Sequence, residues 1–149
     1  MSLHMLIRLL HLASPTLPVG AYSYSQGLEW AVDSGVVQDE ATAGQWIADT
    51  LRWSMSRWEA PLVGRLIEMW RSLEKVEKGT DPILGSVPFS TISEFNDGFL
   101  AARETAELRA ETVQMGYSCL KVLPELFDGA ASGTWLTTLP EPAFPTVWS

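Results

Sequence analysis

Apolar residues recur at helical spacing along most of the chain. Leucines and one isoleucine dominate residues 6–12, and Pro15 ends this short helix because a proline disfavours helical geometry in the residue before it. After a rigid turn, a second short helix is expected over about 25–33, with Gly35 as its C-terminal stop. These segments predict a helical start to the fold.

Two longer helices are expected next. Asp39 has the position of an N-cap for the first of them. Its apolar positions are Trp46, Ile47, Leu51, Met55 and Trp58. Pro61 either breaks this helix or lies in the first turn of the next one, whose apolar positions repeat over 62–73 until Gly79.

The centre of the chain predicts a loop and a last long helix. Residues 79–93 are rich in glycine, proline, serine and threonine, which is typical of a loop. Thr91 or Ser93 can cap a helix that runs to about Leu123 and is stopped by Pro124. Since no segment shows the alternation of a strand, we expect an all-α fold, a compact domain of about five helices without a sheet, over residues 1–128. The second methionine, Met5, suggests that residues 1–4 include an expression scar.

Residues 129–149 differ from the rest of the chain. They carry one charged residue, Glu141, three prolines, and two tryptophans without helical spacing. This composition predicts a linker that leads to a further C-terminal helical part. The helices before Pro124 would then present apolar faces, namely Trp46, Trp58, Trp70 and the stripe over 95–120, that too few elements cover. We therefore expect the chain to self-associate.

Composition narrows the function classes. The 149 residues include 10 basic and 18 acidic ones, for a net charge of −8, so a nucleic-acid backbone would be repelled. No run approaches the roughly 18 apolar residues of a membrane span. The single cysteine fits a reducing cytosol. We expect a cytoplasmic protein that binds neither nucleic acid nor a membrane.

Candidate chemistry in the side chains is sparse. His4 and His11 share a helical face but have no cysteine or carboxylate beside them to complete a metal site. Cys119 is expected to be an ordinary helical thiol. Ser25 lies in half of a nucleophile elbow, yet the first glycine is replaced by Ser23 and no histidine follows to act as the base. Because no phosphate-binding P-loop occurs either, we expect no catalytic, cofactor-binding or metal-binding residues, with a serine hydrolase as a remote alternative.

The last helix carries the most informative pattern. Projected at about 100° per residue, three carboxylates form one stripe, with Arg103 at its edge on the exposed side, where it can pair with Glu107. The stripe consists of Glu104, Glu107 and Glu111. Two interpretations explain this acidic stripe equally well: it is a face that water solvates, or it is a face that docks a basic partner.

Arg109 falls on the opposite, apolar side of the same helix. None of the positions three or four residues away offers a carboxylate. Since an unpaired arginine that faces a core is costly, we expect a partner from another helix, such as Glu29 or Asp33. A simple interhelical salt bridge and a polar cluster that shapes a partner-binding surface both remain open.

Two segments resemble signatures of the UreF family of urease accessory proteins. Residues 9–29 (LLHLASPTLPVGAYSYSQGLE) are similar to the N-terminal signature, and residues 100–111 (LAARETAELRAE) are similar to the second. The resemblance implies a cytosolic, all-helical, dimer-forming protein without catalytic activity. Such proteins join a second accessory protein (UreD, also called UreH) and the GTPase UreG to deliver nickel to apo-urease.

The resemblance also suggests which residues form the partner-binding or structural signature. They are Pro18, Gly20, Tyr22, Tyr24, Gln26, Gly27, Glu29, Arg103, Glu104, Glu107, Arg109 and Glu111. Members of the family continue past position 149 with further helices that contribute to dimerisation and to contact with UreD/UreH. The alternative is a generic helical adaptor unrelated to nickel.

Overall fold

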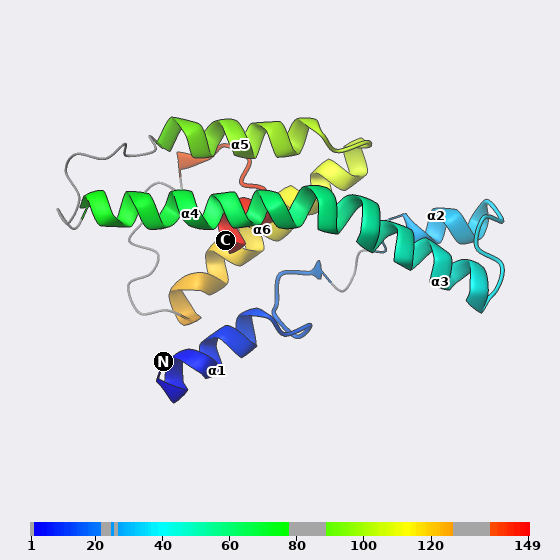
Figure 1. The fold of residues 1–149 in the computed structure, drawn as a ribbon, viewed down its shortest axis with the longest axis horizontal. Helices are drawn as coiled ribbons and strands as arrows, with labels where there is room; N and C mark the ends of the chain where they lie inside the picture. The colour runs from blue at the N-terminus through cyan, green and yellow to red at the C-terminus, as the bar shows by residue number, and fades with distance from the viewer. Residues whose placement is uncertain (1, 22–24, 26, 78–88, 127–137) are drawn as a thin grey trace.

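The computed structural model describes residues 2–21, 25, 27–77, 89–126 and 138–149, and all regular structure within these ranges is helical (Figure 1). In chain order the helices are α1 (Leu3–Leu12), α2 (Leu28–Asp33), α3 (Glu40–Asp49), η2 (Thr50–Glu59), α4 (Ala60–Glu77), α5 (Phe89–Ala101), α6 (Ala106–Leu126) and α7 (Phe144–Trp148). The predicted all-α class is confirmed, although the chain is divided into more helices than the five or so expected. No helix in these ranges is long and apolar enough to cross a membrane.

The elements α3, η2 and α4 join end to end into one long rod (Figure 1). The rod begins at Asp39 as predicted: the Thr42 N–H donates to Asp39 Oδ1 at 2.8 Å and the Asp39 N–H donates to Thr42 Oγ1 at 3.0 Å. Pro61 lies in the first turn of α4, the second of the two expected positions. Because Pro61 has no N–H to donate, the α-helical bond pattern cannot run unbroken through this point, and the preceding η2 takes the wider π-helical form.

The prediction of a single helix from Thr91 or Ser93 to Leu123 is wrong. Helix α5 already begins at Phe89, and a turn over 102–105 separates it from α6. At this turn the Leu108 N–H donates to the Thr105 hydroxyl oxygen at 3.2 Å, so Thr105 satisfies an orphan donor at the start of α6. Pro124 lies inside α6 rather than after it. The rest of the predicted loop, residues 79–88, lies outside the described residues.

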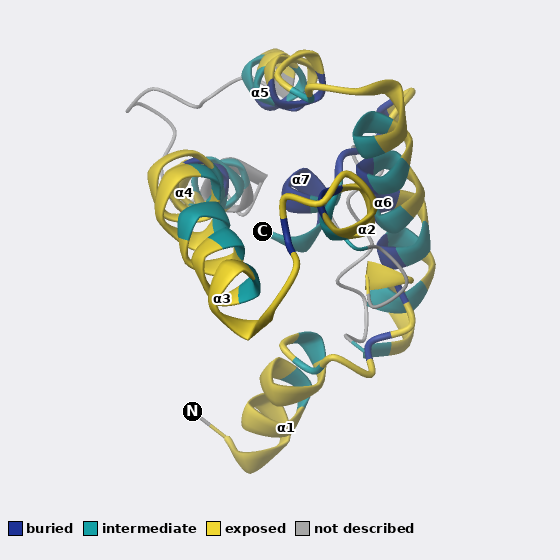
Figure 2. Cartoon of the chain, turned by 90° about the vertical axis from the view of Figure 1, so that its right-hand side faces the viewer, coloured by how far each residue is buried: buried dark blue, intermediate teal, exposed yellow. Residues whose placement is uncertain are grey.

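The linker predicted for the end of the chain is replaced, over residues 138–149, by a packed segment that we call the terminal segment. It includes α7, which lies between α4 and α6 (Figure 2), and it is buried at Leu139, Pro142, Ala143, Pro145, Thr146 and Val147. Side chains rather than a helix satisfy much of its backbone. The buried Asn96 amide donates to the Glu141 carbonyl at 2.9 Å and accepts from the Ala143 N–H at 2.8 Å.

Two apolar clusters hold these elements together. The first joins α4 and α5 to Ala143 through Leu62, Leu66, Ile92, Phe99 and Leu100. The second joins the turn after α1 to α6 and α7 through Leu17, Val19, Cys119 and Val147. Trp70, expected to be uncovered, packs against the first cluster, and its indole N–H donates to the Thr146 carbonyl at 3.1 Å. The terminal segment thus covers a surface that the sequence left open.

One face of the rod stays uncovered. Its side chains repeat at helical spacing along α3 and η2, and each is more than a third exposed. We call this set, Ile47, Leu51, Met55 and Trp58, the apolar stripe. The expectation of an uncovered apolar face is therefore met at Trp58, whereas Trp46 is half-buried. Self-association stays a prediction.

Candidate functional site

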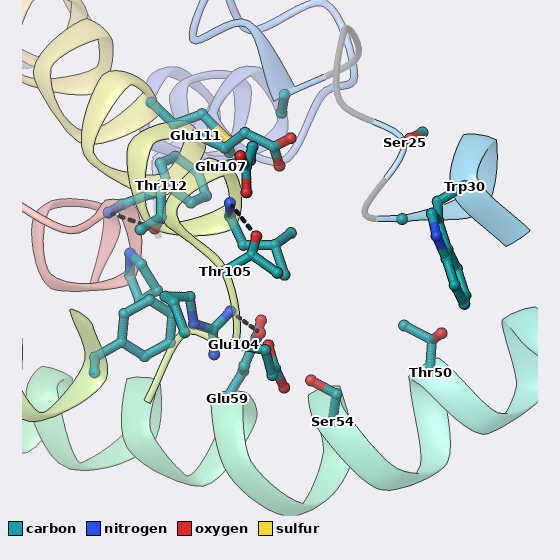
Figure 3. Close-up of a pocket in the computed structure, with 18 of the residues that line it drawn as sticks. Ser25, Trp30, Thr50, Ser54, Glu59, Glu104, Thr105, Glu107, Glu111 and Thr112 are labelled. Atoms are coloured by element: carbon teal, nitrogen blue, oxygen red, sulfur yellow. Dashed lines mark hydrogen bonds and ion pairs between the residues drawn. The ribbon is translucent and has the colours of Figure 1, made fainter. Parts of the chain in front are cut away.

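A cleft of about 970 Å³ opens between α2, the α3–η2 part of the rod, and the turn that joins α5 to α6. Figure 3 shows Glu107 and Glu111 on α6, Trp30 on α2, and Ser54 on the rod around the same space. The cleft brings the two segments that resemble UreF signatures together, because both contribute lining residues. It is the candidate functional site of the chain.

Carboxylates dominate the charge of the cleft. The acidic residues that line it are Glu29, Asp49, Glu59, Glu104, Glu107 and Glu111. Arg103 is the one basic residue among the described residues that line it, and it pairs with Glu59. The cleft therefore carries a strong net negative charge and favours cationic ligands. We call it the acidic cleft.

Tryptophans supply the apolar surface of the acidic cleft. Trp30 is 65% exposed and Trp53 is 55% exposed, and Trp46 adds a half-buried ring. Arg57 lies over the Trp53 ring, 4.1 Å from its centroid, so this ring already holds a guanidinium on one face. Exposed aromatic rings beside carboxylates are a combination that suits a partner with both apolar and basic side chains.

Arg103 does not lie on the exposed edge of a helical stripe, as predicted. Its guanidinium pairs with Glu59 at 3.0 Å and lies 4.1 Å from the centre of the Phe99 ring. The side chains of Arg103 and Glu59 are only 13% and 22% exposed. The prediction of a local pair with Glu107 is wrong because Arg103 lies in the turn between α5 and α6, outside the helix used for the projection.

Arg109 is also placed differently from the prediction. It is half-buried and pairs with Glu141 of the terminal segment at 2.5 Å, not with Glu29 or Asp33. A distant partner is present as expected, but Glu141 precedes α7 instead of lying on a helix, and the two side chains are 40% and 51% exposed. The turn at 102–105 shifts the phase of the following helix, so the side chain does not face a core. Arg109 does not line the acidic cleft.

The carboxylates of the predicted acidic stripe experience different surroundings. Hydrogen bonds from its own backbone N–H and from the Thr105 hydroxyl lower the pKa of Glu107. Partial burial, and then the negative charge of Glu29 across the cleft, raise the pKa of Glu111. Like charges therefore face one another across the cleft, from α2 and from α6, and a cation between them would relieve the repulsion.

The remaining residues of the predicted signature fall into three groups. Gly27 lines the acidic cleft at the start of α2 with φ +85°, a left-handed conformation that favours glycine. Pro18 and Gly20 lie in the exposed part of the turn after α1 and do not line the cleft. Tyr22, Tyr24 and Gln26 lie outside the described residues.

The other candidate reactive residues, which are Ser25, the two histidines and Cys119, do not form a catalytic arrangement among the described residues. Ser25 lines the acidic cleft, where its hydroxyl oxygen accepts from the Glu29 N–H at 3.5 Å, whereas His4 and His11 lie on α1. Burial raises the pKa of Cys119 to about 11, which disfavours its thiolate. Within the described part of the chain, no three histidine, cysteine, aspartate or glutamate residues are grouped to hold a metal ion.

Besides Trp30, sequence reasoning missed three charged or aromatic residues of the acidic cleft: Asp49, Trp53 and Glu59. All three lie on the rod, which was predicted from its apolar positions alone. The spacing of four between Asp49 and Trp53 is the available signal, because it places a carboxylate and an aromatic ring on one face.

Comparison with known proteins decides the family. The sequence profile of the UreF family matches residues 37–149. The urease accessory protein UreF of Azoarcus sp. (strain BH72) is 51% identical over 147 residues, which cover 97% of this chain and 57% of that protein. The chain belongs to the UreF family. The UreF of Dechloromonas aromatica (strain RCB) is 53% identical over 146 residues, 97% of this chain and 58% of that protein.

The match to UreF proteins covers nearly the whole of this chain but only part of each relative. The chain spans somewhat more than half the length of these two UreF relatives. The cleft-lining residues on α6 and at its start fall inside the match of the UreF profile, and those on α2 precede it. No solved structure matches the chain.

Proposed function

We propose that this chain acts as a non-catalytic scaffold in the cytoplasmic maturation of urease. In this role it binds a second accessory protein, UreD/UreH, and the GTPase UreG, forms a homodimer, and promotes the insertion of nickel into apo-urease. Nickel is the cargo of this assembly, and the proposal assigns this chain no catalytic step. The observation that carries the proposal is membership of the UreF family, with about half of the residues identical to urease accessory proteins over nearly the whole chain.

We place the docking surface of this scaffold at the acidic cleft. Six carboxylates around exposed tryptophans form a surface for a basic partner, and the two segments that resemble UreF signatures both contribute to it. Electrostatic complementarity of this kind speeds association and selects partners by charge. No observation favours the alternative of a generic helical adaptor unrelated to nickel, because the matching proteins are urease accessory proteins.

Co-purification tests this function. The chain is co-expressed with UreD/UreH, UreG and apo-urease, with the full-length UreF of Azoarcus sp. as a positive control for complex formation. We expect the chain to retain both accessory proteins and the double variant Glu107→Lys/Glu111→Lys to retain at least about tenfold less, because each change replaces a negative charge in the cleft with a positive one.

The control is Glu125→Lys, which makes one such charge reversal at an exposed position of α6 outside the cleft. Equal retention by the chain and by the double variant would contradict the docking surface. Failure of the unmodified chain to retain either accessory protein, while the Azoarcus UreF retains both, would contradict the function for this chain.

A further inference from the structure

A small apolar groove lies beside the acidic cleft, between the start of α2 and the rod. Its volume is about 160 Å³, and none of the described residues that line it is charged. Leu28 of α2 and Trp46 of α3 form part of its wall, and three members of the apolar stripe, Ile47, Leu51 and Met55, form the rest of its apolar lining. We call it the apolar groove.

The apolar groove and the acidic cleft share a border. Ser25, Trp46 and Thr50 line both of them, and Figure 3 shows Ser25 and Thr50 on the side of the cleft where Trp30 lies. The groove is uncharged, whereas the cleft carries six carboxylate residues and one arginine, which Glu59 already pairs. The two form one continuous surface with an apolar half and a negative half.

Two carboxylates of the negative half have no cation from the described part of the chain. Neither Glu29 nor Glu111 forms an ion pair there, and the charge of Glu29 acts on Glu111 across the cleft. Trp30, beside Glu29 on α2, is 65% exposed. Basic side chains of a partner would relieve the repulsion between the two carboxylates and cover this ring.

We infer that the occupant of this surface is a basic amphipathic helix of a partner protein. Its apolar side chains lie in the apolar groove, and its basic side chains lie in the acidic cleft near Glu29 and Glu111. An α-helix presents two such rows side by side because successive side chains project about 100° apart, whereas a strand presents alternate side chains on opposite faces. This inference rests on the docking surface proposed above and names the kind of partner that it takes.

The spacing of the apolar groove also fits a helix. Ile47, Leu51 and Met55 repeat every four residues along the rod, a distance of about 6 Å per step. Apolar side chains one turn apart on a partner helix have a similar repeat, which is the pattern of helix-in-groove recognition. The three side chains are 51%, 52% and 37% exposed, so the contact removes apolar surface from water.

Two synthetic peptides of about 18 residues test this recognition, a length at which an isolated helix begins to be stable. Both contain the same numbers of leucines and lysines. In the first, the leucines follow the spacing of a helical face, and in the second they alternate with the lysines. We expect fluorescence anisotropy to show that the chain binds the first peptide at least about tenfold more tightly. Equal affinity would overturn the inference, because charge alone would then explain the binding.

Leu51→Gln tests the apolar half without a change of charge. We expect it to weaken binding of the first peptide at least about fivefold. The matched control is Ile7→Gln on α1, because Ile7 is 56% exposed and lines neither the groove nor the cleft. Equal affinities of the two variants would overturn the inference. Loss of self-association in Leu51→Gln with unchanged peptide affinity would also overturn it, since a second copy would then fill the groove.

The double variant Glu29→Gln/Glu111→Gln tests the negative half. We expect at least about tenfold weaker binding of the first peptide and a smaller dependence of its affinity on salt. The matched control is Glu94→Gln/Glu125→Gln, which removes two charges at exposed positions outside both the groove and the cleft. If both double variants bind the peptide equally well, the inference is wrong.

Retention of UreD/UreH and UreG, measured on the same variants, keeps the two proposals apart. Retention by a chain that does not distinguish the two peptides would refute the partner helix and leave the scaffold function standing. Selective binding of the first peptide without retention would refute the scaffold function for this chain and leave the partner helix standing.

Discussion

Arg103 and Glu59 are 44 residues apart in sequence, and their ion pair of 3.0 Å ties the turn between α5 and α6 to the end of η2. Both side chains are mostly buried, and the guanidinium also packs on Phe99. The pair fixes one wall of the acidic cleft to another, so its loss should affect both stability and the shape of the cleft.

We expect Arg103→Ala to destabilise the fold more than Arg109→Ala. Removing Arg103 leaves the half-buried Glu59 carboxylate without its partner, which costs about 1–3 kcal/mol. The more exposed pair of Arg109 and Glu141 contributes about 0–1 kcal/mol. Urea denaturation of both variants measures the difference. Equal free energies of unfolding would show that the burial of the Arg103 pair does not matter to stability.

The sequence predicts that Arg109 is buried and Arg103 exposed, whereas the structure shows the reverse. This difference shows which features of the fold could be predicted from the sequence and which could not. Asp39, Gly35 and Pro61 mark helix ends by local chemistry, through a capping side chain, a positive φ of 75° and a missing N–H, so they could be predicted. The turn at 102–105 has no proline or glycine, and its residues are compatible with a helix. Tertiary contacts, including the pair with Glu59, stabilise the break there. A helical projection that treats α5 and α6 as one helix therefore assigns the residues on the two sides of the break to the wrong faces.

The terminal segment was missed for a related reason. Its prolines and apolar residues lack any helical or strand period, which is also what a linker shows. Its order comes from distant groups: the Asn96 amide, the Thr112 hydroxyl, which accepts from the Phe144 N–H at 3.3 Å, and the Trp70 indole. The acidic cleft was foreseen in part, because Glu104, Glu107 and Glu111 were recognised as one group, but its other walls come from elements whose placement depends on packing.

We expect that any substitution of Gly116 that adds a side chain destabilises the fold. A Cβ at this position of α6 would collide with the carbonyl group of Pro142, with the carbonyl carbon 2.8 Å away. Because the obstacle is backbone of the buried terminal segment, we expect Gly116→Ala to destabilise by about 1–3 kcal/mol. The control is Gly64→Ala on α4, where a Cβ meets nothing within 4 Å and helix propensity favours alanine by about 1 kcal/mol. Opposite shifts of the thermal midpoint are expected, and a neutral Gly116→Ala would refute the close contact.

Asn96 should be a second point of sensitivity in the core. Its fully buried side chain serves the Glu141 carbonyl and the Ala143 N–H, so Asn96→Ala leaves two backbone groups unpaired at about 1–3 kcal/mol each. Glu94→Ala, an exposed change on the same helix, is the control. Amide hydrogen exchange should show lost protection in the terminal segment for Asn96→Ala alone. Unchanged protection there would contradict the proposed anchor.

The thiol of Cys119 should make the fold sensitive to alkaline pH. Burial raises its pKa from 9.0 to about 11, so between these values the unfolded chain releases a proton that the folded chain keeps. Stability from this group is fully present below pH 9 and falls as the pH rises toward 11, by up to about 1.4 kcal/mol per pH unit. The difference in unfolding free energy between the native chain and Cys119→Ala, followed from pH 8 to 10.5, isolates this effect. A difference that does not change with pH would contradict it.

The hydrogen bond from the Trp148 indole to the Leu12 carbonyl spans 136 residues, and Val147 shares a cluster with Leu17 and Val19. Contacts of such long range form late, because the loop that they close is costly in chain entropy. During synthesis, the turn after α1 leaves the ribosome before α6 and α7, its packing partners, are translated. The apolar side chains of this turn, Leu17 and Val19, must therefore wait without cover until α7 has been translated, and this interval is when a holding chaperone would matter most.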